Sequence, residues 1–303
     1  MIVRPRPHWI HLLFVRRGSL VHRIYLQQVL VFLLSCAVVW AHSRSLLTNV
    51  TLTSNPFSLM GVALALFLGF RINASYDRYW EARKHWGSVL VEGRNLVRLA
   101  LTKANADHDV RPLALGVIGF AAAMRNQLRG MPATHGTQDL LPNALRDQLS
   151  HARSAPTLIL LWLAKWLQAH QKECQFDAMV YLKLQDALNA LSFALGSCER
   201  IANTPLPFTY SVILHRSAYL YCAMLPFGLV DTTGLWTPLV VTFVSYTFFS
   251  LEALSDEIEE PFGLATNDLA LDSMVAGIDA SLREMLGDTP PPAPQPDKNY
   301  VLT

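Results

Sequence analysis

The residue types that most often carry chemistry in proteins are scattered along this chain of 303 residues rather than gathered into catalytic motifs. Among the ten histidines, only His8 and His11 share a metal-like spacing, and we expect both to lie at a membrane surface with Trp9. No Gly-rich phosphate loop, HExxH or GxSxG occurs, so the sequence does not predict an enzyme. The cysteines form no CxxC pair, which indicates reduced, buried thiols rather than a zinc site or disulfides; they are Cys36, Cys174, Cys198 and Cys222.

His215 and Arg216 are the ionisable residues in the most unusual position, because they interrupt an otherwise apolar stretch. Ionisable side chains at membrane depth are rare and usually functional. We expect these two to snorkel or to pair with an acid such as Glu252 or Asp231, rather than to line a permeation path.

The composition indicates a membrane protein. Apolar residues make up 51% of the chain, charged residues only 16%, and the mean hydropathy is +0.25. Soluble domains usually carry about 25% charged residues, so this chain lacks the charge that a water-facing surface needs. A formal net charge of +2 is too small to suggest nucleic-acid binding.

Four stretches are apolar enough to enter a bilayer: residues 25–41, 57–70, 209–230 and 236–251. A simple spanning helix needs roughly 20 apolar residues. The second and fourth stretches are shorter, which suggests that their helices continue into protein-lined regions. The apolar stretch 158–167 is short and contains Lys165, so we expect it in the core of a helical bundle.

Basic residues predict the orientation, because Lys and Arg gather on the cytoplasmic side of membrane proteins. Residues 1–23 contain five arginines, and the stretch after residue 70 contains many more. The connection 42–56 contains only Arg44, and the turn 231–235 contains no basic residue. We therefore expect a multi-pass protein with two membrane hairpins and with both termini and residues 71–208 in the cytoplasm.

The middle region is predicted to be helical almost throughout, so the fold class is an all-α membrane protein with a large cytosolic helical bundle. Helices are expected near 71–104, 109–130, 155–171 and 176–203. Residues 286–303 are rich in proline, and we expect a flexible tail there.

The second apolar stretch contains two neighbouring ridges of side chains at a spacing of four residues. This spacing drifts only about 40° per step on a helix with 3.6 residues per turn. Small residues at this spacing let membrane helices approach closely, and a narrow apolar ring can gate a pore by dewetting. Both ridges are also compatible with packing inside a monomeric bundle. The bulky ridge is Val62, Leu66 and Phe70, and the small ridge is Gly61, Ala65 and Gly69.

Three segments carry a resemblance to a known family. The stretches FLGFRINASYDRYWEAR (67–83), CERIANTPLPFTY (198–210) and DEIEEPFGLATNDLALD (256–272) resemble the bestrophin family in its bacterial branch. Their order and spacing extend the resemblance over residues 1–285, which we interpret as one integrated channel domain. The motif residues to which we assign structural roles are Arg78, Trp80, Glu81, Pro261, Phe262 and Gly263.

The resemblance implies a homopentameric ion channel with a single axial pore in the bacterial inner membrane, surrounded by lipids and without a cofactor. It implies that the bulky ridge lines the neck of this pore, and that an apolar side chain forms a second, cytosolic aperture. By position this is Leu182, with Val180 or Met179 as alternatives. The permeant ion is chloride by family analogy, or a sodium-like or potassium-like cation as in bacterial members. A secondary transporter is the alternative, although neither internal repeats nor a polar site at mid-membrane is evident.

Animal bestrophins have a run of acids after Pro-Phe-Gly that helps to bind calcium, and this chain departs from that pattern. Asp268 and Asp272 alone are a poor set for an ion that prefers six to eight oxygen ligands. We therefore expect no metal site. The acids of this region are instead expected to pair with arginines of the amino-terminal segment or of a neighbouring copy; they are Glu257, Glu259, Glu260, Asp268 and Asp272.

The bulky ridge is uncharged, so it cannot choose the sign of a permeant ion. Charges and helix ends at the pore mouths would decide. Asp177 and Asp231 would favour cations, whereas Asn55 and Phe57 lie where helix amino ends would meet anions.

Overall fold

The computed structural model describes residues 1–3, 10, 20–44, 54–104, 108–172, 174, 176–298 and 300–303. His8, Trp9, His11 and most amino-terminal arginines fall outside the described residues. The described parts are helical, as predicted, and contain one isolated antiparallel bridge between Ile2 and Val301. The chain separates into two compact units: residues 5–79 with 205–260, and residues 1–4 with 80–204 and 261–303.

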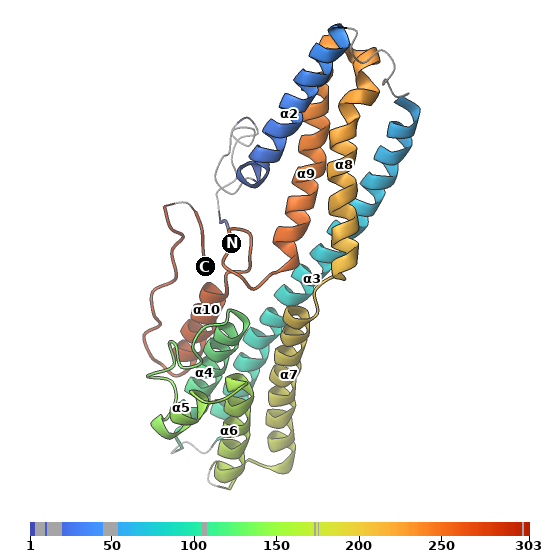
Figure 1. Ribbon diagram of the computed structural model, residues 1–303. Coiled ribbons are helices and arrows are strands. Elements are labelled where there is room, and N and C mark those ends of the chain that lie inside the picture. The colour runs from blue at the N-terminus through green and yellow to red at the C-terminus, as the bar shows by residue number, and fades with distance from the viewer. Residues whose placement is uncertain are drawn as a thin grey trace. The chain divides into compact units, whose positions relative to one another are not determined.

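The first unit contains the apolar helices (Figure 1). They are α2 (Val21–Ser43), the first part of α3 (Ser54–Lys103), α8 (Phe208–Thr233) and α9 (Thr237–Glu259). The predicted apolar stretches lie within these helices, except that Trp236, the first residue of the fourth stretch, belongs to the short 3-10 helix before α9. Among the residues that the structure describes, three helical stretches are long and apolar enough to cross a membrane, at Val21–Ser43, Asn55–Lys103 and Phe208–Glu259. The last stretch contains both α8 and α9, so the predicted count of four spans stays a prediction.

The turn between α8 and α9 is built by Gly234. Its φ of 52° lies in the left-handed region, which costs little only for glycine. A short 3-10 helix, Gly234–Trp236, follows at once, and the Thr237 hydroxyl donates to the Gly234 carbonyl at 2.6 Å. Pro238 lies in the first turn of α9, where its missing N–H costs nothing.

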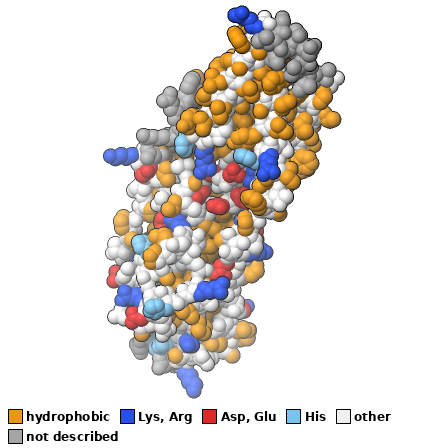
Figure 2. All heavy atoms as spheres, viewed as in Figure 1, with side chains coloured by type: hydrophobic (Ala, Val, Ile, Leu, Met, Phe, Trp, Pro, Cys, Tyr) orange, Lys and Arg blue, Asp and Glu red, His pale blue; other side chains and the backbone are white. Residues whose placement is uncertain are grey.

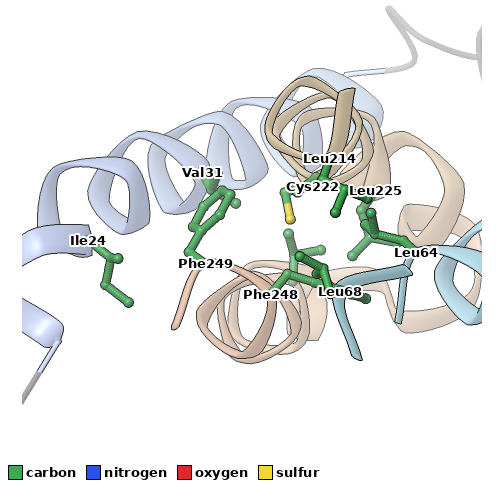
Figure 3. Close-up of a cluster of buried hydrophobic side chains, with 11 residues drawn as sticks. Ile24, Val31, Leu64, Leu68, Leu214, Cys222, Leu225, Phe248 and Phe249 are labelled. Carbon is green, nitrogen blue, oxygen red and sulfur yellow. The ribbon is translucent and has the colours of Figure 1, made fainter. Parts of the chain in front are cut away.

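A buried apolar cluster joins α2, α3, α8 and α9 (Figure 3). Leu64 and Leu68 of α3 belong to this cluster together with Leu214 and Cys222 of α8 and Phe248 and Phe249 of α9. Gly228 admits the Phe57 ring, since a Cβ added there would lie 2.4 Å from a ring carbon. This cluster fixes how α3 is rotated about its axis, and therefore which of its side chains face away.

The second unit is a bundle of α4 (Arg111–Leu128), α5 (Asn143–Leu149), α6 (Ala155–His170), α7 (Ala178–Asn203), α10 (Leu271–Met285) and the second part of α3. Ile159, Leu163 and Leu167 of α6 are fully buried, which confirms that residues 158–167 belong to a bundle core. Asp177 caps α7 by accepting a hydrogen bond from the Val180 N–H at 2.7 Å.

The segment after Leu286 contains no helix among its described residues. Its end is nonetheless tied to the start of the chain, because the Val3 N–H donates to the Tyr300 carbonyl at 2.8 Å. The Ser273 N–H of α10 donates to the Thr303 carbonyl at 2.9 Å. These contacts hold the last residues in place, whereas the flexibility of the rest of this segment stays a prediction.

Candidate functional site

The bulky ridge of α3 points away from the other helices of its unit. Val62, Leu66 and Phe70 are 62%, 56% and 58% exposed, whereas Leu64 and Leu68 are 3% and 0% exposed. On a helix with 3.6 residues per turn, the centre of the ridge lies about 180° from the midpoint of Leu64 and Leu68. The chain therefore presents a continuous apolar ridge that its own packing does not use.

The three small residues of α3 differ in their surroundings. A Cβ added at Gly61 would lie 2.7 Å from the Tyr221 hydroxyl of α8, so Gly61 provides close packing within the chain. A Cβ at Gly69 would meet nothing within 4 Å, and Ala65 is exposed. Gly61 thus serves the fold of the chain itself, while Ala65 and Gly69 stay candidates for contact between copies.

The candidate cytosolic aperture lies in the first turns of α7. Leu182 is 53% exposed and Met179 is 68% exposed, whereas Val180 is partly buried. Leu184, two positions further on, is fully buried in the bundle. Leu182 and Met179 are therefore free to contact something outside the chain, but the role of this turn as an aperture stays a prediction.

The residues of the first family-like segment make structural contacts. The Arg78 Nε donates to the Glu259 carbonyl at 3.3 Å. Glu81 accepts a hydrogen bond from Arg200 of α7, and the Arg83 guanidinium stacks on the Trp80 ring at 5.2 Å. Arg78 thus links α3 to the end of α9, and Glu81 links α3 to α7.

The Pro-Phe-Gly turn is a closed loop. The Leu269 N–H donates to the Pro261 carbonyl at 2.9 Å, and Phe262 is buried. Asp268 holds the inside of the loop, because its Oδ2 accepts from the Ala265 N–H at 2.7 Å. A Cβ at Gly263 would lie 2.5 Å from the same oxygen. Gly263 is therefore needed for the approach of this carboxylate.

Asp272 pairs with arginines from elsewhere in its own chain, whereas the pairing of Glu257, Glu260 and Asp268 with the amino-terminal segment or with a neighbouring copy stays a prediction. Asp272 accepts from Arg125 at 2.9 Å and from Arg129 at 2.7 Å, and both arginines come from α4. Each carboxylate oxygen of Asp272 therefore has an arginine partner within the chain. These arginines reach Asp272 because α4 packs directly on α10.

The apolar part of α3 ends at a buried ionic cluster. The Arg71 side chain is 4% exposed, and its Nη2 lies 2.5 Å from Asp256 Oδ1 and 3.4 Å from Glu259 Oε2. Ser75 lies one helical turn after Arg71, and Ser255 comes directly before Asp256. Both are fully buried, and their hydroxyls lie 3.0 Å apart. Arginine in such a position satisfies two carboxylates of α9 at once, which fixes α3 against α9.

His215 pairs with Glu252, as expected. Its Nδ1 lies 2.5 Å from Glu252 Oε1, and the Glu252 side chain is 6% exposed. Asp231, the other acid considered, lies at the opposite end of α8 and faces His42 at 3.6 Å. Arg216 is exposed and forms no ion pair with any other residue that the structure describes.

Two cavities lie in the unit of apolar helices. One cavity, of about 340 Å³, contains residues of the Arg71 cluster and of the His215–Glu252 pair in its lining. The lining residues are Arg71, Ser211, Val212, His215, Arg216, Glu252 and Asp256. An apolar groove of about 250 Å³ lies between α3 and α8, lined by Pro56, Phe57, Met60, Ser217, Leu220, Tyr221 and Met224. Phe57 contributes to packing against α8, whereas Asn55 is exposed at the first turn of α3.

The cluster of Arg71 was not singled out as a site from the sequence. The sequence shows several charged residues directly after residue 70, but it does not show that Arg71 pairs with Asp256, which is 185 residues away. The one available signal was that three apolar stretches each end at an ionisable residue.

These features define an all-helical protein with apolar helices long enough to cross a membrane and an unpartnered apolar ridge on one of them. The sequence profile of bacterial and fungal bestrophin proteins matches residues 1–284. The chain therefore belongs to the bestrophin family.

The relatives support this assignment along nearly the whole chain. A voltage-dependent anion channel-forming protein of Ralstonia nicotianae is 42% identical over 291 residues, covering 95% of each chain. The voltage-dependent anion channel-forming protein YneE of Escherichia coli is 40% identical over 304 residues, covering 100% of each. The crystal structure of a bacterial bestrophin homologue from Klebsiella pneumoniae matches with a TM-score of 0.84 and 36% identity, covering 88% of this chain and 100% of that one.

Proposed function

We propose that this protein is an ion channel in which copies of α3 surround a pore and present Val62, Leu66 and Phe70 to its axis. The observation that carries this proposal is the exposure of three large apolar side chains on the face of α3 opposite its packed face. Apolar side chains exposed in a continuous row usually mark an interaction surface. In a bilayer the row would face lipid, another helix or a pore.

The polar continuation of α3 favours the pore. The same helix runs from the apolar ridge to Lys103 without a break, and its later turns carry many charged side chains. Any membrane helix becomes polar where it leaves the bilayer, but α3 continues as one helix from Arg71 to Lys103, which suits a pore that extends beyond the membrane. A ring of such helices would give ions a path from the bilayer into the cytosol past a dry neck.

Assembly as a pentamer, with Leu182 at a second aperture, extends the proposal by family resemblance. The structure supports it through the exposure of Leu182 and Met179 on a capped, well-formed helix. The distribution of basic residues supports an orientation with both termini in the cytoplasm, and the bacterial inner membrane is proposed from the family resemblance.

Small monovalent ions are the proposed cargo, with anions favoured because the relatives named above are anion channel-forming proteins. The neck itself is uncharged, so the charges at its ends would set the preference. Conduction of sodium-like or potassium-like cations is the alternative. We expect no calcium gating, since both oxygens of Asp272 have arginine partners.

Reconstitution of the purified protein in planar bilayers tests the function. A channel gives unitary currents, and the reversal potential in a salt gradient reports whether anions or cations carry them. Saturable exchange without unitary currents would instead support a secondary transporter, and the absence of both would overturn the proposal.

A further inference from the structure

The apolar runs of three helices end at the same cavity. In α3 no charged residue precedes Arg71, in α8 the uncharged run 217–230 follows Arg216, and in α9 the uncharged run ends at Glu252. Arg71, Arg216 and Glu252 all line the cavity of about 340 Å³. Uncharged runs of this kind mark the hydrocarbon layer, so the cavity lies at the level where lipid headgroups begin.

Figure 2 shows the same division on one face of the molecule. Hydrophobic side chains cover the apolar helices, and basic, acidic and histidine side chains gather where this cover ends. The cavity is therefore at a depth that a phospholipid headgroup reaches without leaving the membrane surface.

The accessible acid of the cavity shares its cation. Arg71 lies between two carboxylates, Asp256 and Glu259, so Asp256 has no described cation to itself. The Asp256 side chain is 53% exposed and lines the cavity, which makes it the accessible carboxylate of the two. The cavity wall therefore includes an acid that is open to a second cation.

A basic side chain of α8 also lines the cavity. Arg216 forms no ion pair with another residue that the structure describes, and Ser211 of the same helix contributes a hydroxyl to the lining. His215 and Glu252, two further lining residues, pair with each other. The cavity thus offers an anion-binding group and a cation-binding group that do not neutralise one another.

We propose that this cavity binds the headgroup of a zwitterionic phospholipid with a primary ammonium, such as phosphatidylethanolamine. The phosphate would lie against Arg216 and Ser211, where a guanidinium forms charge-assisted hydrogen bonds with phosphate oxygens. The ammonium would lie against Asp256, and the acyl chains would follow the apolar surface of α8. The volume is sufficient for a small polar ligand.

Native mass spectrometry of the full chain in detergent, titrated separately with three lipids, tests this proposal. The lipids are phosphatidylethanolamine, phosphatidylcholine (whose methylated ammonium donates no N–H hydrogen bond) and phosphatidylglycerol (which has no ammonium). Wild type should retain phosphatidylethanolamine best. Arg216→Gln should weaken its retention roughly tenfold, since a hydrogen bond between charged groups is lost. Asp256→Asn should reduce the preference for phosphatidylethanolamine over phosphatidylglycerol.

Arg216→Lys, which keeps the charge, should recover part of the retention. Arg98→Gln is the matched control, because Arg98 is an exposed arginine of the same α3 helix that does not line the cavity. Equal retention of the three lipids, or an unchanged affinity in Arg216→Gln, would overturn the proposal. Displacement of the lipid by free phosphoethanolamine at similar concentrations would assign the site to a soluble zwitterion instead and would also overturn it. The readout needs no current, so it is independent of the proposed channel activity.

Discussion

Leu68 and Phe70 stand two positions apart on α3 and face opposite environments: Leu68 is fully buried, and Phe70 is 58% exposed. Leu68 belongs to the cluster that joins α3 to α8 and α9, while Phe70 is not a member of that cluster. The fold thus assigns one side chain to stability and leaves the other available for a partner or a pore.

Leu68 and Phe70 should therefore respond differently when their side chains are truncated to alanine. Leu68→Ala should lower the free energy of unfolding by about 3 kcal/mol, since it leaves a cavity in a packed cluster. Phe70→Ala should leave thermal stability in detergent nearly unchanged and raise ion flux. Equal destabilisation by both variants would show that Phe70 is also a packing residue.

Gly69 and Gly61 give a second matched pair. Gly69→Leu should reduce the fraction of oligomer in size-exclusion chromatography with light scattering, because the new side chain has space within the chain but none at a close contact between copies. Gly61→Leu should instead lower the thermal stability of the chain, because the side chain would collide with Tyr221. A fully assembled Gly69→Leu protein would remove Gly69 from the interface.

Leu182 and Leu184 test the cytosolic aperture in the same way. Leu182→Ala should raise unitary conductance with little change in stability, because its side chain is exposed. Leu184→Ala should destabilise the bundle by about 3 kcal/mol, because Leu184 is fully buried. Bilayer recordings of Leu182→Ala that match wild type would show that this turn does not narrow the ion path.

Arg71→Met should destabilise the membrane unit by roughly 2 kcal/mol, because it leaves Asp256 and Glu259 without their shared cation. The loss of unfolding free energy is limited because water can solvate the exposed Asp256 carboxylate. Thermal unfolding of Arg71→Met beside Arg98→Met, an exposed position of α3, measures the effect. Equal unfolding temperatures for the two variants would contradict a role of the Arg71 cluster in holding α3 against α9.

The Arg111–Asp288 pair makes stability depend on acid pH. Two hydrogen bonds of 2.6 and 2.9 Å join the guanidinium to the carboxylate, and they hold the pKa of Asp288 below its ordinary value of 3.8. A lowered pKa contributes stability that is present above the ordinary carboxyl value and is lost as pH falls through the lowered one. The unfolding temperatures of wild type and Asp288→Asn should therefore differ near neutral pH and converge below about pH 4.

Asp139→Asn is the control for that series, because Asp139 is exposed on the connection between α4 and α5. A difference between wild type and Asp288→Asn that stays constant down to pH 3 would contradict the assignment.

The helices and the exposed ridge were predictable because both depend on local periodicity. Val62, Leu66 and Phe70 follow one another at four-residue steps, and the structure exposes all three. The pairing of His215 with Glu252 was also predictable, because an ionisable side chain at membrane depth needs a partner and the apolar helices contain few acids.

Partners chosen by tertiary packing were not predictable. Asp272 was expected to meet arginines of the amino-terminal segment or of a neighbouring copy, but its described partners are Arg125 and Arg129, which stand 147 and 143 residues away in the sequence. Gly61 looked equivalent to Gly69 in its spacing, and only the position of Tyr221 separates them. Periodicity describes one helix at a time and cannot name the neighbour on each face.

The most direct test of the central claim is the unitary conductance of the full-length channel with Val62, Leu66 and Phe70 replaced by alanine, recorded in planar bilayers beside wild type. We predict intact assembly with a larger conductance, because truncation widens the neck and eases its wetting. A correctly assembled triple variant with the conductance of wild type would contradict the assignment of this ridge to the pore.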